Sequence, residues 1–490
     1  MTRPDRRRFL TGSLGLAAAL SAGACQTVGA KQARRPGPIR VGVIGVRGRG
    51  RGHVGAFKNS PDSEVVAICD PDTSTWEGAL KAVPSARTYT DLRELLADPD
   101  IDAVSIATPN HWHALASVWA LKAGKHVYVE KPLSHTFAEG RALKRAAARY
   151  GKLVQHGTQA RSHRATRDAM AWLQAGGLGE VKLARGLCYK RRGSIGKVEG
   201  EVAPPETLDY DLWTGPAELQ PLRRKNLHYD WHWDFNTGDG DVGNQGVHQM
   251  DIARWGLGLD GWPSAVQSVG GRVGYDDDGN TPNTMITTFE FGDKRIVFEV
   301  RGLPTKGYRI LPELESDAKE SDLPFGYSTS IGTIFHGEKG TLVSSSYEKL
   351  VAYDHDGNVI ETFEGGGNHF QNFLDAIKAE DESLLNANAL EGHRSSALCH
   401  LANLSYMLGT ERSAKSNSWK FEGDEAMEEA LMRMLGHLGD NGLLLSSKLR
   451  YGPRLAFDAA AAEFRGQDAR AANALLSRRQ RAPFEMDSRA

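Results

Sequence analysis

The chain has 490 residues, which is too long for one ordinary domain. Of these residues 40% are hydrophobic and 25% charged, a composition that is typical of a globular protein. Its 60 basic and 61 acidic residues leave a formal net charge of −1, so no overall positive field favours nucleic acid or an anionic membrane, and a neutral small molecule is the expected partner. Four widely spaced cysteines without a CxxC pair exclude a disulfide framework and argue against a structural zinc site.

The first 37 residues differ in composition from the rest of the chain. Paired arginines followed by Phe-Leu precede an apolar stretch over residues 14–24, which is too short to span a bilayer. This pattern predicts a twin-arginine signal that exports the folded protein to the periplasm, with a linker up to residue 37; a disordered basic tail is the alternative. Cys25 follows a small-residue cleavage site, so a lipid anchor also stays open, although Ala22 stands where lipoprotein signals usually have Leu.

Residues 38–158 alternate short apolar runs with stretches of helical spacing. The expected strands are Ile39–Ile44, Glu64–Cys69, Ala103–Ala107 and Val127–Val129. The expected helices are Val54–Asn59, Leu92–Leu96, His113–Ala123 and Ala138–Tyr150. Alternation at this pitch predicts an α/β fold, a doubly wound parallel sheet of the Rossmann type.

A glycine cluster lies between the first expected strand and the first expected helix, where backbone N–H groups can approach a pyrophosphate. The loop consists of Gly45, Val46, Arg47, Gly48, Arg49 and Gly50. Asp70 ends the next strand, where an acid binds the adenosine ribose and repels a 2′-phosphate, so NAD is favoured over NADP. Arg47 stands where the second glycine is usual, so Arg47 or Arg49 is a further candidate phosphate contact. A flavodoxin-like fold without a dinucleotide is the alternative.

The pattern changes in the second half of the chain. Alternating stretches at 285–291 and 296–300 predict antiparallel strands with one solvent-exposed face. Residues 369–410 return to helical spacing, and so does the C-terminal stretch. These patterns predict an α+β domain over residues 159–410 and a helical C-terminal extension over residues 411–490.

Three segments carry a resemblance to a known family. They are Ala107–His113 (ATPNHWH), Val129–Leu133 (VEKPL) and Gly243–Asp251 (GNQGVHQMD). In this order they resemble the Gfo/Idh/MocA oxidoreductases, over roughly residues 38–410, and further segments resemble exported members. The resemblance implies a Rossmann domain followed by an α+β domain whose open, mostly antiparallel sheet commonly mediates oligomerisation, so a homo-oligomer is expected.

The reaction that the resemblance implies is hydride transfer between a sugar or polyol carbinol and a tightly bound nicotinamide. Lys131 matches the family lysine between cofactor and substrate, and His248 matches the histidine near the reacting carbon, whose imidazole titrates in a useful range. The alternative, purely structural roles are a surface ion pair for Lys131 and a packed core or surface histidine for His248. Asn244 stands where many members have an acid, so a carboxylate relay from His248 is excluded. Asp251 is expected to contact the substrate or a structural partner rather than act as the base.

The resemblance also extends the expected site around the cofactor and the sugar. The additional cofactor-binding residues are Thr108, Pro109, Asn110, His113, Glu130, Lys131 and Gln159. The expected substrate-binding residues are Asn244, Asp251, Trp112, His228, Trp231 and Trp233. The aromatic members can stack on sugar faces or simply pack in a core. The histidines at 111, 113, 228 and 232 lack a matching cysteine or carboxylate set, so no metal site is expected.

Export constrains the chemistry, because no fresh nicotinamide is available outside the inner membrane. One solution is a bound cofactor that is reduced by one sugar and reoxidised by a second acceptor. Another is a redox-neutral glycosidase that oxidises a carbinol, eliminates the glycoside and returns the hydride. A third interpretation is a non-catalytic sugar-binding protein on the same fold.

Overall fold

The first half of the chain forms a parallel sheet. A computed structural model describes residues 36–310, 323–416, 419–421 and 423–486, so the expected export signal and Cys25 lie outside the described residues. Six parallel strands follow the order β3-β2-β1-β4-β5-β6, which is the order of a dinucleotide-binding sheet and confirms the Rossmann prediction. The elements are β1 (Ile39–Ile44), α1 (Arg49–Lys58), β2 (Ser63–Cys69), α2 (Trp76–Leu80), β3 (Arg87–Tyr89), α3 (Leu92–Ala97), β4 (Ala103–Ile106), α4 (Asn110–Lys122), β5 (His126–Val129), α5 (Phe137–Tyr150) and β6 (Val154–His156).

Local sequence explains where these elements begin and end. The four residues of β4 are all buried, as expected for a strand covered on both faces. Helix α5 begins after Thr136, whose side chain accepts a hydrogen bond from the Glu139 N–H, and ends at Gly151, which adopts φ +60°.

The second half is built on a sheet of twelve strands. Its main order is β16-β15-β14-β13-β7-β10-β9-β8-β18-β17, with β19 and β20 joined beside β8. Among the strands that the structure describes in this sheet, only β7 and β10 pair in parallel, so the sheet is mixed and mostly antiparallel, as predicted. The strands are β7 (Val181–Cys188), β8 (Ala265–Gly271), β9 (Thr284–Phe291), β10 (Lys294–Arg301), β13 (Ile331–Gly337), β14 (Gly340–Ser344), β15 (Lys349–Tyr353), β16 (Val359–Glu364), β17 (Thr410–Ser413), β18 (Lys448–Tyr451), β19 (Leu455–Asp458) and β20 (Glu463–Arg465), and a separate hairpin pairs β11 (Tyr308–Arg309) with β12 (Ser328–Thr329).

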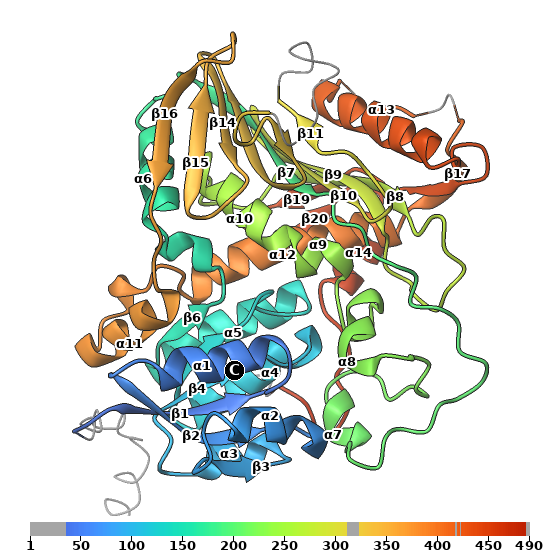
Figure 1. Ribbon diagram of the computed structural model, residues 1–490. Coiled ribbons are helices and arrows are strands. Elements are labelled where there is room, and N and C mark those ends of the chain that lie inside the picture. The colour runs from blue at the N-terminus through green and yellow to red at the C-terminus, as the bar shows by residue number, and fades with distance from the viewer. Residues whose placement is uncertain (1–35, 311–322, 417–418, 422, 487–490) are drawn as a thin grey trace, which may run out of the picture. The chain divides into compact units, whose positions relative to one another are not determined.

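Helices pack around this sheet and between it and the first one. The helices are α6 (Arg164–Gln174), α7 (Tyr210–Thr214), α8 (Leu227–Asp230), α9 (Gly240–Asn244), α10 (Gly246–Gly256), α11 (His369–Ala379), α12 (Ala389–Met407), α13 (Glu425–Asp440) and α14 (Ala469–Leu475). Helices α10 and α12 cover one face of the large sheet, and α12 also packs on α5 and β6 of the parallel sheet (Figure 1). Helix α12 therefore joins the two sheets around the site described below.

The expectation of one solvent-exposed sheet face is wrong for β9 and β10. Both strands are buried over most of their length on both faces, because α13 packs on the side opposite α10 and α12 (Figure 1). Met427, Leu431 and Met434 of α13 form a buried cluster with Ile286 and Val297. This helix therefore occupies part of the sheet face that the resemblance links to oligomerisation, and the expected homo-oligomer stays a prediction.

Two expected segment boundaries also need correction. The extension over residues 411–490 is not simply helical, because it contributes β17 to β20 to the sheet as well as α13 and α14. These strands are only three or four residues long, too short to show a period of two. The segment over 159–410 also contributes to the first half of the molecule, because Phe373 and Leu374 of α11 pack with Phe57 of α1 in the core of the parallel sheet.

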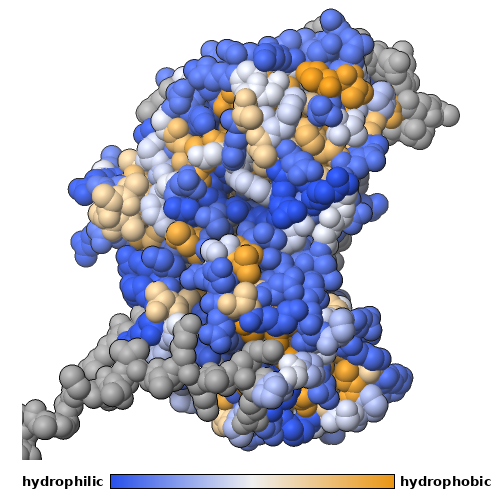
Figure 2. Space-filling model, turned by 90° about the vertical axis from the view of Figure 1, so that its left-hand side faces the viewer, coloured by the Kyte–Doolittle hydropathy of each residue, from blue (hydrophilic) through white to orange (hydrophobic). Residues whose placement is uncertain are grey.

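The surface is mainly hydrophilic on the face drawn in Figure 2, where hydrophobic side chains form small dispersed patches outside the grey residues. The larger exposed apolar side chains include Val359, Met432 and Leu445. No helix of the described residues has the length and the apolar composition that a bilayer span requires.

Candidate functional site

A cavity of about 460 Å³ opens at the carboxyl edge of the parallel sheet, the edge at which α/β folds bind their ligands. The residues after β1, β2, β4 and β5 form its floor, and residues 212–248 of the second half form the opposite wall. The structure brings most of the predicted residues together there: Gly45, Arg47, Gly48, Arg49, Asp70, Thr108, Pro109, Asn110, Trp112, His113, Glu130, Lys131, Gln159, His228, Trp231, Asn244 and His248.

The glycine loop has two positions at which only glycine fits. A Cβ on Gly45, at φ +79°, would lie 2.8 Å from the Ala107 carbonyl, and one on Gly50 would lie 1.8 Å from the Gly45 oxygen. The loop therefore folds tightly against the end of β4. Val46 and Gly50 do not line the cavity, because Val46 is in the core and Gly50 permits the close packing of α1, and their assignment as cofactor contacts stays a prediction.

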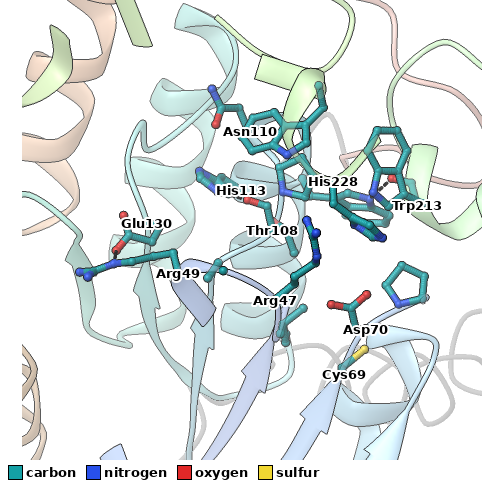
Figure 3. A pocket seen from close by; sticks show the side chains of 18 of the residues that line it. Arg47, Arg49, Cys69, Asp70, Thr108, Asn110, His113, Glu130, Trp213 and His228 are labelled. Atoms are coloured by element: carbon teal, nitrogen blue, oxygen red, sulfur yellow. Dashed lines mark hydrogen bonds and ion pairs between the residues drawn. The ribbon is translucent and has the colours of Figure 1, made fainter. Parts of the chain in front are cut away.

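The two arginines of the loop differ in their surroundings. Arg49 Nε lies 2.8 Å from a Glu130 carboxylate oxygen, and His53 Nε2 lies 3.0 Å from the same oxygen. These partners hold the pKa of Glu130 well below its usual range, against the effect of burial. Arg47 instead points into the cavity toward Asp70 and His228 (Figure 3). Arg47 is thus the better placed of the two for a phosphate group.

Asp70 lies at one end of the cavity, beside an aromatic wall. Its carboxylate accepts hydrogen bonds of 3.0 Å from the backbone N–H groups of Val46 and Asp72. Burial nevertheless raises the pKa of this carboxyl. Trp112 packs at this end too, with its indole N–H donating to the Trp213 carbonyl and its ring edge against Phe484. The position of Trp112 therefore favours a wall for a nucleotide over a sugar platform.

Thr108 Oγ1 and Gln159 Oε1 are buried atoms of cavity-lining residues and have no hydrogen-bond partner among the described residues. His113, in contrast, is used structurally, since its two ring nitrogens lie 2.6 Å and 2.9 Å from the carbonyl oxygens of Pro132 and Thr108. Asn110 likewise donates to Asp239 at 2.9 Å. The tight glycine loop and the two unpartnered atoms fit a dinucleotide that supplies their missing contacts.

Lys131 lies at the opposite end from Asp70, after β5. Its ammonium donates to the backbone carbonyl of Asn244 and, at 3.3 Å, to the side-chain oxygen of the same residue. Burial lowers the pKa of Lys131 and the Arg49 charge adds to this, while the charges of Glu130 and Asp241 act in the opposite direction. A lysine in these surroundings exchanges a proton more readily than an exposed one.

His248 is the second predicted reactive residue and lines the same end of the cavity. It is buried, its ring centroid lies 5.7 Å from that of Tyr347, and its Nδ1 has no partner among the described residues. Burial, followed by the positive charge of Lys131, lowers its pKa to about 3. The expectation that this imidazole titrates in the useful range is therefore wrong, and His248 is neutral near pH 7.

Two predicted substrate contacts do not line the cavity. Asp251 is buried and accepts hydrogen bonds from Arg161 and Ser395, so its carboxylate is occupied by a structural ion pair. Trp233 is buried beneath the guanidinium of Arg192, at 5.3 Å. The sequence alone could not reveal this, because Asp251 follows His248 by three residues and Trp233 follows Trp231 by two, and both His248 and Trp231 line the cavity.

Other residues line the site without having been assigned to it. Tyr229 and His232 lie beside Trp231, and His232 stacks on the Trp231 ring at 3.6 Å. Burial lowers the pKa of His232 to about 3. The Trp/His-rich run at residues 228–235 indicated that aromatic side chains gather here. Because this run has no helical or strand period, the sequence does not tell which of its rings face the cavity. No group of three or more metal-ligating side chains occurs among the described residues.

Comparison with known proteins follows the same division of the chain. The family model described as "Oxidoreductase family, NAD-binding Rossmann fold" matches residues 39–158, and the model of the family's C-terminal alpha/beta domain matches residues 181–298. The chain belongs to the Gfo/Idh/MocA oxidoreductase family. This assignment agrees with the resemblance carried by the three sequence segments.

Curated relatives match over a limited part of their length. Glycosyl hydrolase family 109 protein 2 of Shewanella sp. (strain ANA-3) is 35% identical over 159 residues, which are 28% of this chain and 35% of the relative. The 1,5-anhydro-D-fructose reductase of Ensifer adhaerens is 36% identical over 137 residues, 27% of this chain and 40% of the relative. The chain thus matches well under two thirds of these relatives.

Solved structures share the fold at low identity. The WlbA dehydrogenase of Bordetella pertussis, solved with NADH and UDP-GlcNAcA, has a TM-score of 0.53 and 19% identity, covering 75% of this chain and 95% of that one. Levoglucosan dehydrogenase with NADH and levoglucosan has a TM-score of 0.54 and 19% identity, covering 75% and 96%. These likenesses support the fold alone.

Proposed function

We propose that the protein uses a tightly bound NAD to exchange a hydride with a carbinol carbon of a sugar or polyol. The observation that carries this proposal is that one cavity joins the glycine loop and Asp70 at one end to Lys131 and His248 at the other. Similar solved proteins bind NADH and sugar-like molecules, which supports the same class of ligand here.

NAD fits the residues present. The glycine loop and Arg47 would hold its pyrophosphate, Asp70 would face the adenosine ribose, and the unpartnered atoms of Thr108 and Gln159 supply further hydrogen bonds. The Asp70 carboxylate favours a ribose hydroxyl over a 2′-phosphate, so NAD is preferred to NADP. When bound, the nicotinamide supplies the hydride acceptor or donor for the carbinol carbon.

The side chains at the reactive end divide the remaining work. Lys131 in its neutral form accepts the hydroxyl proton during oxidation and returns it during reduction. His248 is neutral, so it orients the sugar oxygen by a hydrogen bond and adds no positive charge. Asn244 holds the Lys131 amine through two oxygen atoms and, as an amide, takes no part as a base.

The decisive experiment is mass spectrometry of nucleotide extracted from the protein purified without added cofactor. We expect NAD in near-stoichiometric amount and much less NADP, and a change in nicotinamide absorbance when members of a sugar and polyol panel are added. Protein that contains no dinucleotide and binds none on titration would refute the proposal.

A second candidate is a redox-neutral glycosidase on the same cofactor, favoured by the relatives named glycosyl hydrolase family 109. Oxidation of a carbinol acidifies the neighbouring C–H, which allows the glycosidic bond to break by elimination before water adds and the hydride returns. Release of the leaving group from chromogenic glycosides without net NADH formation would select this activity. Net NADH formation without cleavage would select the dehydrogenase.

A further inference from the structure

Asp241 is a buried acid that lies close to the reactive end of the cavity but does not line it. It belongs to α9, one helical turn before Asn244, and is 1% exposed. Arg192 pairs with its carboxylate through two hydrogen bonds, Nε to Oδ2 at 3.0 Å and Nη2 to Oδ1 at 2.7 Å. A buried acid is retained at a cost unless it is well paired, and this geometry satisfies it.

The carboxylate is connected to Lys131 through the Asn244 amide. Asn244 Nδ2 donates to Asp241 Oδ1 at 3.4 Å, while Asn244 Oδ1 accepts from the Lys131 ammonium at 3.3 Å. An amide has distinct donor and acceptor ends, so an acid on its nitrogen side keeps its oxygen directed at the lysine.

The same pair also reaches the aromatic wall. Arg192 Nη1 donates to the Tyr229 hydroxyl at 2.7 Å, and Tyr229 lines the cavity beside Trp231. The Arg192–Asp241 pair thus connects the wall opposite the sheet with the amide that holds Lys131.

We propose that Asp241 is a positioning residue for the reaction, fixing the orientation of the Asn244 amide and stabilising the Lys131 ammonium by its negative charge. The inference rests on the proposed function, in which Lys131 exchanges the proton. Many family members carry an acid at the position of Asn244. In this chain the acid that acts on the lysine is Asp241, one helical turn before that position.

The sign of the effect follows from charge. Asp241 stabilises the protonated lysine and so raises its pKa against the effect of burial. Removing that charge lowers the pKa of Lys131 further, and the neutral amine then persists to lower pH. The acid limb of sugar oxidation therefore moves to lower pH, and the alkaline limb of the reverse reduction moves the same way.

The test uses two variants. Asp241→Asn removes the charge but leaves Arg192 unpaired, so Asp241→Asn with Arg192→Gln keeps a neutral hydrogen-bonding pair in case the single variant does not fold. A matched control is Asp102→Asn, because Asp102 accepts two hydrogen bonds from the guanidinium of Arg40 at the amino edge of the parallel sheet, the edge opposite the cavity.

The measurement is the pH dependence of Lys131 acetylation by acetic anhydride, followed by mass spectrometry on the protein as purified, beside the pH profile of kcat/KM. We expect the Lys131 midpoint to fall by about one pH unit in Asp241→Asn, to fall by less in the double variant because the positive charge of Arg192 is removed as well, and to stay unchanged in the control. A midpoint that does not move in folded Asp241 variants, or moves equally in the control, overturns the inference. A shifted labelling curve in protein that turns over no sugar upholds the role of Asp241 and counts against the proposed function instead.

Discussion

Lys131 provides the first prediction at the scale of single residues. Because burial lowers its pKa from the ordinary value of 10.5, and only the neutral amine accepts a proton, oxidation should rise with pH to a midpoint below 10.5. Lys131→Met should lower kcat by about 10²- to 10⁴-fold and retain bound NAD. The check is steady-state kinetics beside nucleotide analysis. Lys125→Met is the control, since Lys125 is also buried and donates to the carbonyl oxygens of Asp98 and Ile101.

His248 leads to the opposite expectation about pH. Its pKa of about 3 leaves it neutral throughout the range in which an ordinary histidine titrates. His248→Gln should therefore lower kcat/KM by a similar factor at every pH between about 5 and 8, without moving the Lys131 limb. Rate profiles of both proteins across that range test this. Loss of a limb near pH 6.5 in the variant would contradict it.

At the scale of elements, the sequence predicted those strands and loops that a regular apolar pattern or a fixed motif marks. Strands β1, β2, β4 and β5, the glycine loop and the Glu130-Lys131-Pro132 segment were read from apolar runs or fixed motifs, and they occur as predicted, whereas β3 and β6, of three residues each, were not predicted. Strands β17 to β20 were missed because a strand of three or four residues has no resolvable period. For Asp251 and Trp233 the structure agrees with the structural alternatives, an ion pair and core packing, rather than with substrate contact. The sequence could not decide between them because the direction of a side chain depends on tertiary packing, which turns one side of α10 toward Arg161.

Residues 478–484 form a C-terminal strap that holds helix α7 against the end of the cavity where the nucleotide is expected. Arg481 donates to the carboxylate of Asp211, within α7, and to the carbonyl of Gly215, directly after α7. Arg478 donates to Glu139 of α5 and to the His111 carbonyl of α4. The strap thus ties α7, whose Leu212 and Trp213 line the cavity, to the parallel-sheet half.

Removing the contacts of the C-terminal strap should let bound NAD exchange with free NAD in solution. Arg478→Ala with Arg481→Ala removes several charge-assisted hydrogen bonds, so NAD release should accelerate about tenfold or more. Release can be followed as replacement of bound NAD by isotope-labelled NAD, detected by mass spectrometry. Arg479→Ala is the matched control, because Arg479 is an exposed neighbour of the same charge. Equal exchange rates in the three proteins would show that the strap does not retain the cofactor.

At the scale of the whole molecule, the predicted export links localisation to cofactor retention. The predicted twin-arginine route carries folded proteins, so on this route NAD must enter the fold before export and stay there afterwards. Replacing the signal pair, Arg6→Lys with Arg7→Lys, should retain the protein in the cytoplasm with NAD bound, whereas the same exchange at Arg34 and Arg35 in the linker should leave export intact. Fractionation with nucleotide analysis of each fraction measures both properties. Export that continues after the signal change would rule out this route, and exported protein without NAD would mean that the cavity does not hold its cofactor outside the cytoplasm.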